Sequence, residues 1–514
     1  MSPTVNTTPL QFGLLSNRHH THALATNVFL RLLGGIFLVA FLSLWAQLDG
    51  LIGSRGIAPV SELLPWVYGQ LGSSAYLKLP TVCWISSTDG FLNGVCIAGA
   101  ALAMLLMVGV APRWVVALLW LLYLSLVSVG GPFLQFQWDN LLLETAFFSI
   151  FLASPRLWPT RLESPHPLSL WLLRWLLFRL MFLSGLVKLT SGDLAWRNLT
   201  ALRFHYWTQP LPTPIAYYVN LLPPWFQTAS AVVMFAIELV APFLIFGPRP
   251  ARLVAAAAIA FLQLAIAATG NYGFFNLLSL ALCLLLLDDG ALAKALPRRH
   301  RARVESPAEP RATPRGLRVG FAIAAAFFVL VSVAEMRFWR RDLPSPIEDI
   351  LAVLQPFRSI SSYGLFAVMT LDRPEILVEG SSDGRIWRGY EFKWKPGDPT
   401  KLPRFVAPHQ PRLDWQMWFA ALGSCARNPW FVRFQARLLE GTPEVLRLLA
   451  STPFPASPPR YIRSMTYQYR FSDWAEHRNS NVFWNRELVG PYCPVLSLKD
   501  GRLIAVSAKS LEEQ

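Results

Sequence analysis

Long apolar segments, separated by short polar and proline-containing connections, dominate the first two-thirds of the chain. Nine of them have about the length, roughly 20 residues, that a helix needs to cross a hydrocarbon core. They cover residues 27–48, 92–110, 114–130, a segment that starts near Trp138, 168–189, 225–247, 252–269, 274–287 and 317–334. The pattern predicts an α-helical polytopic membrane domain with about nine spans.

After residue 335 the apolar segments give way to alternating and amphipathic ones. Residues 375–394 alternate around Ser-Asp-Gly, which predicts a β-hairpin with Asp383 in its turn, and residues 460–471 predict a further strand. Residues 413–422 and 428–450 have helical periodicity. These patterns predict a mixed, β-rich extramembrane domain.

The same patterns set the expected domain boundaries. We expect a disordered tail at 1–24, a membrane domain at 25–335 and the β-rich domain at 336–514. An Arg-, Pro- and Ala-rich segment at 288–316 reads as a linker within the membrane domain.

Composition supports membrane insertion and limits the possible partners. The 514 residues are 53% hydrophobic and 15% charged, with a mean hydropathy of +0.37. The net charge of +15 does not indicate nucleic acid, because Lys and Arg collect on the cytoplasmic connections of membrane proteins. We therefore expect membrane lipid as a partner and no nucleic acid.

The connections after every second predicted span are basic, which predicts the orientation of the chain. They carry Arg113; Arg156 and Arg161; Arg249 and Arg252; and a cluster that begins at Lys294. The positive-inside rule places these connections, including the linker, in the cytoplasm. If nine spans alternate, everything after residue 335 faces the periplasm or lumen.

The stretch 183–224 combines polar and aromatic side chains between apolar walls. Its notable residues are Lys188, Asp193, Trp196, Arg197, His205 and Gln209. The segments SGLVKLTSGD, WRNLTAL, HYWTQPLP and LPPWF resemble the lipase maturation factor family, and so do QPFRSISSYGLFAVMT, PRLDWQMWFAAL and WNRELVGPYCPV further on. The family consists of endoplasmic reticulum membrane proteins with bacterial relatives.

This resemblance implies a function outside the membrane. It implies a maturation factor that assists exported client proteins, lipases among them, in folding on the periplasmic or luminal side. The Arg, Ala and Leu bias favours a bacterial-type member in the inner membrane, whereas a eukaryotic host would place the chain in the endoplasmic reticulum membrane.

Charged residues inside apolar segments need partners. A charge at the bilayer centre costs about 2.5–3.5 kcal/mol on insertion scales, and the spans hold Asp139, Glu144, Arg174, Arg179, Lys188 and Glu238. We expect structural pairing, with Arg179 and Glu238 as one interhelical pair. Further candidate motif residues are Trp138 beside the acids, and Asn271 and Tyr272 in the turn GNYGFFN.

Lys188 has two interpretations. GLVKL with Trp196 eight residues later resembles the membrane domain of the vitamin K-dependent carboxylase, which would make Lys188 a general base acting on a lipid or quinone-like substrate. The other interpretation, which we favour, is a lysine that snorkels to the interface beside Asp193.

No other motif predicts chemistry. The sequence has no nucleophile elbow, phosphate loop or dinucleotide fingerprint, and its cysteines have no metal-ligand spacing. We expect no cofactor and no metal, and a folding factor rather than an enzyme. Cys425 and Cys493 form a disulfide in an oxidising space or remain two separate thiols; the sequence leaves both open.

Overall fold

The computed structural model of the chain describes residues 21–159, 162–295, 315–336 and 345–506. Within these ranges, six helices are long and apolar enough to cross a membrane. They are α1 (Ala23–Trp45), α5 (Asp89–Val108), α6 (Pro112–Val129), α8 (Pro167–Thr190), α12 (Pro224–Leu239) continued by α13 (Ala241–Leu244), and α14 (Arg249–Thr269). The predicted tail up to residue 20 and linker residues 296–314 lie outside the described residues.

The predicted count of nine spans is not confirmed, because three of the nine segments form helices that are too short or not apolar enough over their length to count among the six. These are α7 (Gln137–Leu152), α15 (Phe275–Leu284) and the apolar part, Arg318–Ala334, of α18 (Arg315–Glu335). At a rise of about 1.5 Å per residue, a helix of 10 residues covers roughly half of a hydrocarbon core. Protein covers most of α7, including its two carboxylates, so its apolar side chains form a protein core.

Short helices lie at the two ends of the apolar bundle. One end carries α2 (Leu48–Ile52), α3 (Val60–Leu71), α4 (Ala75–Lys78), α9 (Leu194–Arg197), α10 (Leu202–Thr208) and α11 (Pro214–Asn220). The other end carries α16 (Asp289–Ala295). Asp289 accepts hydrogen bonds from the amides of Ala23, Leu24 and Ala25. The beginning of the predicted linker is therefore an ordered cap on the first turn of α1.

The C-terminal region contains two antiparallel sheets. The larger has the order β2-β1-β5-β6-β7, and β3 pairs with β4 in the smaller. The strands are β1 (Arg373–Ser381), β2 (Arg388–Gly389), β3 (Glu391–Phe392), β4 (Leu449–Ser451), β5 (Tyr461–Phe471), β6 (Trp484–Lys499) and β7 (Arg502–Val506). The predicted hairpin is present as β1 and β2, and Asp383 accepts the turn amides of Arg385 and Ile386.

Four helices accompany these sheets: α20 (Arg412–Ala421), α21 (Pro429–Leu439), α22 (Pro443–Leu446) and α23 (Trp474–Ser480). A further helix, α19 (Ser345–Leu354), contacts α18 instead. The prediction of one helix over 428–450 is wrong. Gly441, with a φ of +65°, ends α21, Pro443 starts α22, and the segment finishes as β4.

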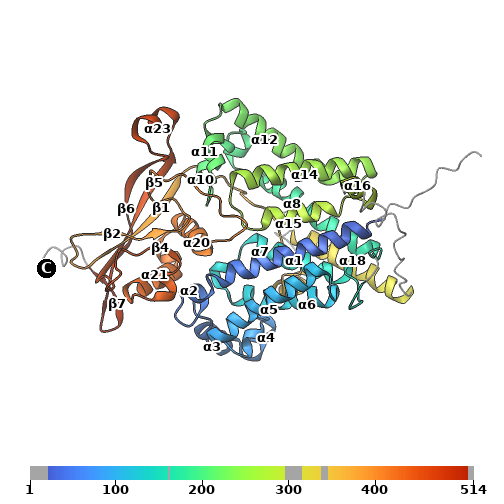
Figure 1. Cartoon of the computed structure of the whole chain (residues 1–514), viewed down its shortest axis with the longest axis horizontal. Coiled ribbons are helices and arrows are strands. Elements are labelled where there is room, and N and C mark those ends of the chain that lie inside the picture. Colours follow the sequence, from blue (N-terminus) through green and yellow to red (C-terminus); the bar gives the residue numbers. More distant parts are fainter. Residues whose placement is uncertain (1–20, 160–161, 296–314, 337–344, 507–514) are drawn as a thin grey trace, which may run out of the picture.

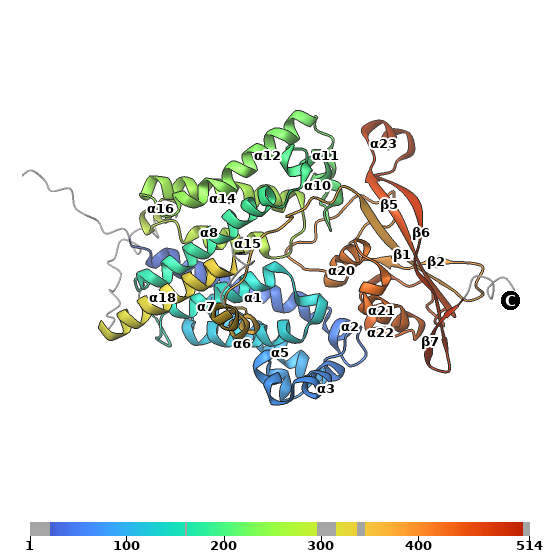
Figure 2. The same ribbon diagram turned by 180° about the vertical axis from the view of Figure 1, so that it is seen from behind.

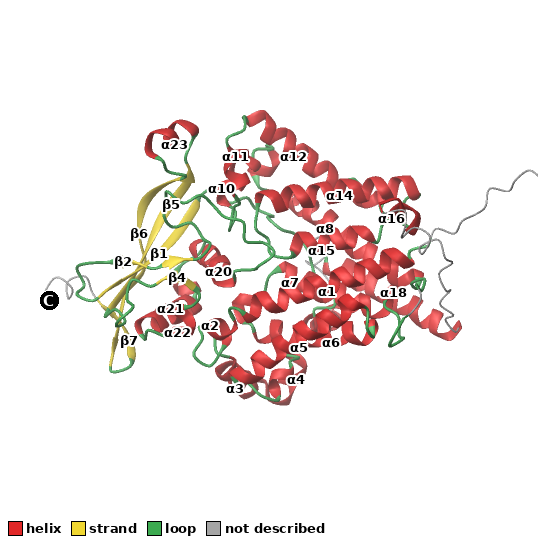
Figure 3. Cartoon of the chain, in the orientation of Figure 1, coloured by secondary structure: helices red, strands yellow, loops and turns green. Residues whose placement is uncertain are grey.

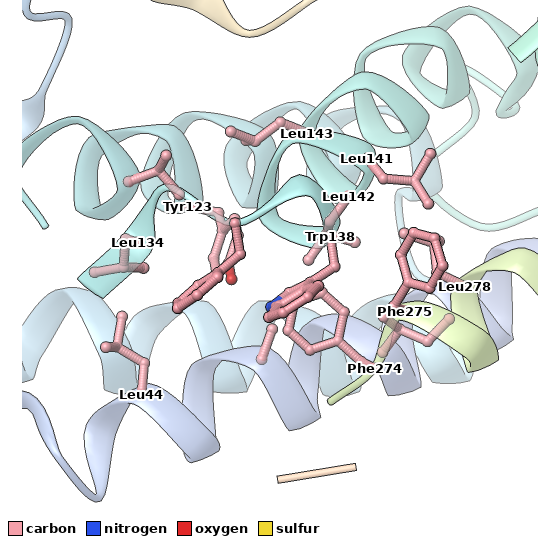
Figure 4. Packing of buried hydrophobic residues seen from close by; sticks show 14 of the residues in the cluster. Leu44, Tyr123, Leu134, Trp138, Leu141, Leu142, Leu143, Phe274, Phe275 and Leu278 are labelled. Carbon is pink, nitrogen blue, oxygen red and sulfur yellow. The ribbon is translucent and has the colours of Figure 1, made fainter. Parts of the chain in front are cut away.

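The strands occupy one end of the long axis, and α16 and α18 lie at the other (Figures 1, 2 and 3). Between them, the core of the bundle continues into the C-terminal region. Trp138 of α7 packs against Trp415 of α20, with ring centroids 4.7 Å apart. Figure 4 shows Trp138 beside Phe274 and Phe275, so side chains from distant parts of the sequence share one core.

Candidate functional site

Most of the predicted motif residues lie where the helical bundle meets the C-terminal region. We call this contact, formed by α1, α7, α8, residues 191–213 and 271–273 on one side and residues 359–418 on the other, the domain junction. Asp139 of α7 is fully buried there and binds Arg412 of α20 at 2.8 and 2.9 Å. The Tyr123 hydroxyl also donates to Asp139 at 2.5 Å. The buried acid is thus paired across the junction.

Glu144 lies further along the same helix and is also paired at the junction. It binds Arg179 of α8, and it accepts hydrogen bonds from the Tyr363 hydroxyl at 2.6 Å and the Ser361 amide at 3.1 Å. Arg179 donates in turn to the Ser361 carbonyl. The predicted pairing of Arg179 with Glu238 is therefore wrong.

Lys188, not Arg179, is the partner of Glu238. Its ammonium lies 2.9 and 2.8 Å from the two Glu238 carboxylate oxygens and donates to the Ser184 carbonyl at 2.9 Å. A Cβ at Gly185 would come within 2.9 Å of Glu238, so the glycine allows α12 to approach α8 closely enough for this pair. Because Lys188 is only 4% exposed, the predicted snorkelling beside Asp193 is also wrong.

Asp193 and Trp196 bind the loop that enters the C-terminal region. The Asp193 carboxylate caps α9 through the Ala195 and Trp196 amides and accepts the Met369 amide at 2.8 Å. The Trp196 indole donates to the Phe366 carbonyl at 2.9 Å. The predicted motif residue Arg197 is exposed at the end of α9 and does not join this group.

Gln209 and Asn271 satisfy buried backbone groups at the junction. The Asn271 side chain accepts the Val406 and Ala407 amides and donates to the Arg404 carbonyl. Gln209 donates to the Thr269 carbonyl and accepts the Tyr272 hydroxyl at 2.8 Å. Buried polar loop ends need such partners, so both amides are positioned to hold irregular chain in a fixed conformation.

His205 lies between this network and an apolar cavity. Its Nε2 is 3.4 Å from the Tyr272 oxygen. Since the Tyr272 proton goes to Gln209, that oxygen can only accept, and Nε2 carries the proton. Burial, together with the charge of Lys188, lowers the pKa of His205 to about 4. The imidazole is therefore neutral at physiological pH.

The cavity has a volume of about 650 Å³ and lies among α8, α10, α12 and α14. Lys188, Glu238, Trp196, His205 and Tyr272 line it, and the rest of its wall is mostly aliphatic and aromatic. The Lys188 ammonium lies 5.5 Å from the Trp196 ring centroid. Four of the predicted site residues therefore share one cavity with Glu238, which was predicted only as a paired charge.

Arg373 and Arg412 make buried contacts across the junction that the sequence analysis missed. Arg373, fully buried on β1, donates to the carbonyls of Trp207, Gln209 and Pro210 and forms an ion pair with Glu375. In the sequence, Arg373 follows an acid and Arg412 precedes an apolar residue, and neither context indicates burial. Only their partners, which are distant in the sequence, distinguish these two residues from surface arginines.

Two further observations bear on chemistry. Cys425 and Cys493 form a disulfide, which decides between the two open alternatives, while Cys83, Cys96 and Cys283 are free and buried. Among the described residues, no group of three or more His, Cys, Asp or Glu side chains could hold a metal ion.

Comparison with known proteins covers both halves of the chain. The profile of the lipase maturation factor transmembrane domain matches residues 24–294, and that of the lipase maturation factor C-terminal domain matches residues 359–494. No solved structure matches the chain.

Individual relatives match over nearly the whole length. Lipase maturation factor 2 of Xenopus laevis is 35% identical over 93% of this chain and 83% of its own. Lipase maturation factor 1 of Mus musculus is 35% identical over 92% and 87%, and lipase maturation factor 2 of Homo sapiens is 34% identical over 93% and 84%.

Proposed function

Because the chain belongs to the lipase maturation factor family, we propose that this multi-pass membrane protein helps exported proteins, lipases among them, to fold beyond the membrane. The observation that carries the proposal is that both family profiles match, over residues 24–294 and 359–494. The chain thus has both the membrane region and the C-terminal region of the family, as expected if clients bind outside the bilayer.

The arrangement of charge supports an orientation with the C-terminal region on the export side. Helices α7 and α14 each have one end at the domain junction, near Asp139 and Asn271. Their opposite ends lie beside basic residues: Arg113 donates to the Ala153 carbonyl, and Arg249 pairs with Asp288. The positive-inside rule assigns that basic end to the cytoplasm. This argument does not depend on the number of spans.

The disulfide between Cys425 and Cys493 supports the same orientation, since disulfides persist in oxidising compartments such as the periplasm and the lumen of the endoplasmic reticulum. We propose the bacterial inner membrane as the location, or the endoplasmic reticulum membrane in a eukaryotic host.

The alternative role of Lys188 as a catalytic base is not retained. A general base needs an accessible lone pair, whereas the Lys188 ammonium donates to both Glu238 oxygens and to the Ser184 carbonyl. This geometry supports a structural ion pair.

Exposed apolar side chains of the C-terminal region are the proposed client contacts. Phe405 is 54% exposed and Phe419 is 44% exposed, whereas Trp415, Trp418 and Trp430 are buried and belong to the core. Unfolded clients expose apolar segments, which such side chains can bind through burial of apolar surface.

The proposal is tested by deleting the gene in its native host and measuring the activity of secreted lipases per amount of secreted lipase protein. We expect this specific activity to fall and to recover with the full chain. Unchanged specific activity without the gene would reject the proposed function. Removing residues 336–514 is a poor test, because it would deprive the buried Asp139 of Arg412 and the buried Glu144 of the hydrogen bonds from Ser361 and Tyr363.

Client contact is tested by a photocrosslinking amino acid at Phe405, with Lys401 as the matched control. Both positions are exposed and lie in the same loop. We expect crosslinks to a newly synthesised lipase from position 405 and at least fivefold fewer from 401. Equal yields would count against a specific apolar contact.

A further inference from the structure

The cavity among α8, α10, α12 and α14 opens toward the outside of the bundle. Ile215, Trp225, Val233 and Phe261 line it and are themselves 40–69% exposed. Trp225 and Val233 belong to α12 and Phe261 to α14. Only 39% of the apolar segment of the span formed by α12 and α13 is buried in the protein, and only 28% of the apolar segment of α14 is buried. The mouth of the cavity therefore lies on a lipid-facing surface.

The inner end of the cavity is polar but carries no net charge. The Lys188 ammonium and the Glu238 carboxylate neutralise each other at 2.8 Å. His205 is neutral, since burial and the nearby ammonium lower its pKa to about 4. A charged headgroup would have to leave water without a free counter-ion, which is costly. A hydroxyl or ester can instead exchange weak hydrogen bonds with the edges of the ion pair.

The size of the cavity suits one lipid. Its volume of about 650 Å³ falls within the range of about 300–1,000 Å³ that is typical of small-molecule sites. Aliphatic and aromatic side chains such as Leu262, Ile266 and Phe226 form most of its wall. An apolar chain buried there is shielded from water, but it gains little free energy relative to the equally apolar bilayer. Selectivity must therefore come from the polar end.

We propose that this cavity binds a single uncharged lipid of the bilayer, a monoacylglycerol or a long-chain alcohol. The lipid enters between α12 and α14, and its hydroxyl end lies at the Lys188–Glu238 pair. Apart from Leu365 and Phe366, the residues that line the site belong to the membrane half of the chain, and the site does not include the proposed client contacts. Its failure would leave the proposed maturation function untouched.

The test uses the full chain in phosphatidylcholine nanodiscs with two photoreactive probes. One is a monoacylglycerol and the other a lysophosphatidylcholine, both with a diazirine on the same acyl position. We expect the monoacylglycerol to label residues that line the cavity, to saturate, and to be displaced by unlabelled monoacylglycerol. We expect the charged probe to label these residues at least fivefold less.

A matched pair of variants on α12 links the labelling to the cavity. Ala229 and Ala236 are both exposed, but only Ala229 lines the cavity. We expect Ala229→Trp to lower labelling at least fivefold and Ala236→Trp to leave it within twofold of the parent. If Ala229→Trp fails to fold, Val233→Trp at the mouth takes its place. Unchanged labelling in the folded cavity variant, or equal labelling by the two probes, would overturn the proposal.

Discussion

Arg412 of α20 and Asp139 of α7 face each other across the domain junction, joined by hydrogen bonds of 2.8 and 2.9 Å. Both side chains are at most 1% exposed. Arg412 also donates to the Phe133 carbonyl, and the charge of Asp139 raises its pKa further above the already high value of arginine. The C-terminal region and the helical bundle therefore share a buried charge pair, so each half completes the polar contacts of the other.

We expect Arg412→Met to lower the free energy of unfolding by about 3–5 kcal/mol, because it leaves Asp139 buried and unpaired. The measurement is thermal or denaturant unfolding of the purified chain in detergent. The double variant Asp139→Asn with Arg412→Met removes both charges and should recover a large part of the loss. If Arg412→Met lowered the free energy of unfolding by less than about 1 kcal/mol, the pair would behave like one on the surface. That result would contradict the burial of the Arg412–Asp139 pair at the domain junction.

The Lys188–Glu238 pair allows a direct comparison of structural and catalytic roles. Lys188→Met leaves Glu238 buried without its partner, and we expect it to destabilise the chain by about 3–5 kcal/mol. Lys188→Met combined with Glu238→Met replaces the pair by apolar groups and should restore most of the stability. If the role is structural, lipase maturation recovers with the double variant. A folded double variant without any activity would favour chemistry at Lys188.

The disulfide predicts how the chain responds to reductant. Cys425 and Cys493 are separated by 68 residues, and closing such a loop removes about 4 kcal/mol of conformational entropy from the unfolded state in the chain-entropy model. We expect reductant to lower the melting temperature of the parent chain. The double variant Cys425→Ser with Cys493→Ser should melt lower and show no further response, because the remaining cysteines described are free and buried. A reductant effect of equal size in the variant would show another origin.

The sequence predicted the apolar helices well because their signal is local. Residues 168–189 and 252–269 correspond closely to α8 and α14. The partners of the charges within them were not local. Arg179 and Lys188 are nine residues apart on α8, which places them on opposite faces at about 100° per residue. One therefore meets α7 and the other α12, and no periodicity in α8 reveals which helix packs on which face.

The same limit applies to α7 and the domain junction. Trp138, Asp139 and Glu144 within an apolar segment predicted a membrane span with internal charges. Their partners Arg412, Tyr363 and Trp415 come from more than two hundred residues later in the chain. The family resemblance located the right segments, but only the packed structure shows that most of these residues join the two halves.

The pH dependence of stability should reveal Asp414, which is buried on α20 and accepts hydrogen bonds from the Trp394 and Lys395 amides. Burial raises its pKa from 3.8 to about 6. Between these values the folded chain retains a proton that the unfolded chain has lost, so this group's contribution to stability falls as the pH rises from about 4 to 6. We expect Asp414→Asn to abolish this decrease in stability, which amounts to up to about 3 kcal/mol. The melting temperature of the variant should therefore decrease less with rising pH than that of the parent chain.

Asp398→Asn is the control with the opposite sign, because hydrogen bonds from Thr400 lower the pKa of Asp398. That carboxylate stabilises the fold above its unfolded pKa and loses this effect as the pH falls. If both variants changed the pH profile in the same direction, the raised pKa of Asp414 would be refuted.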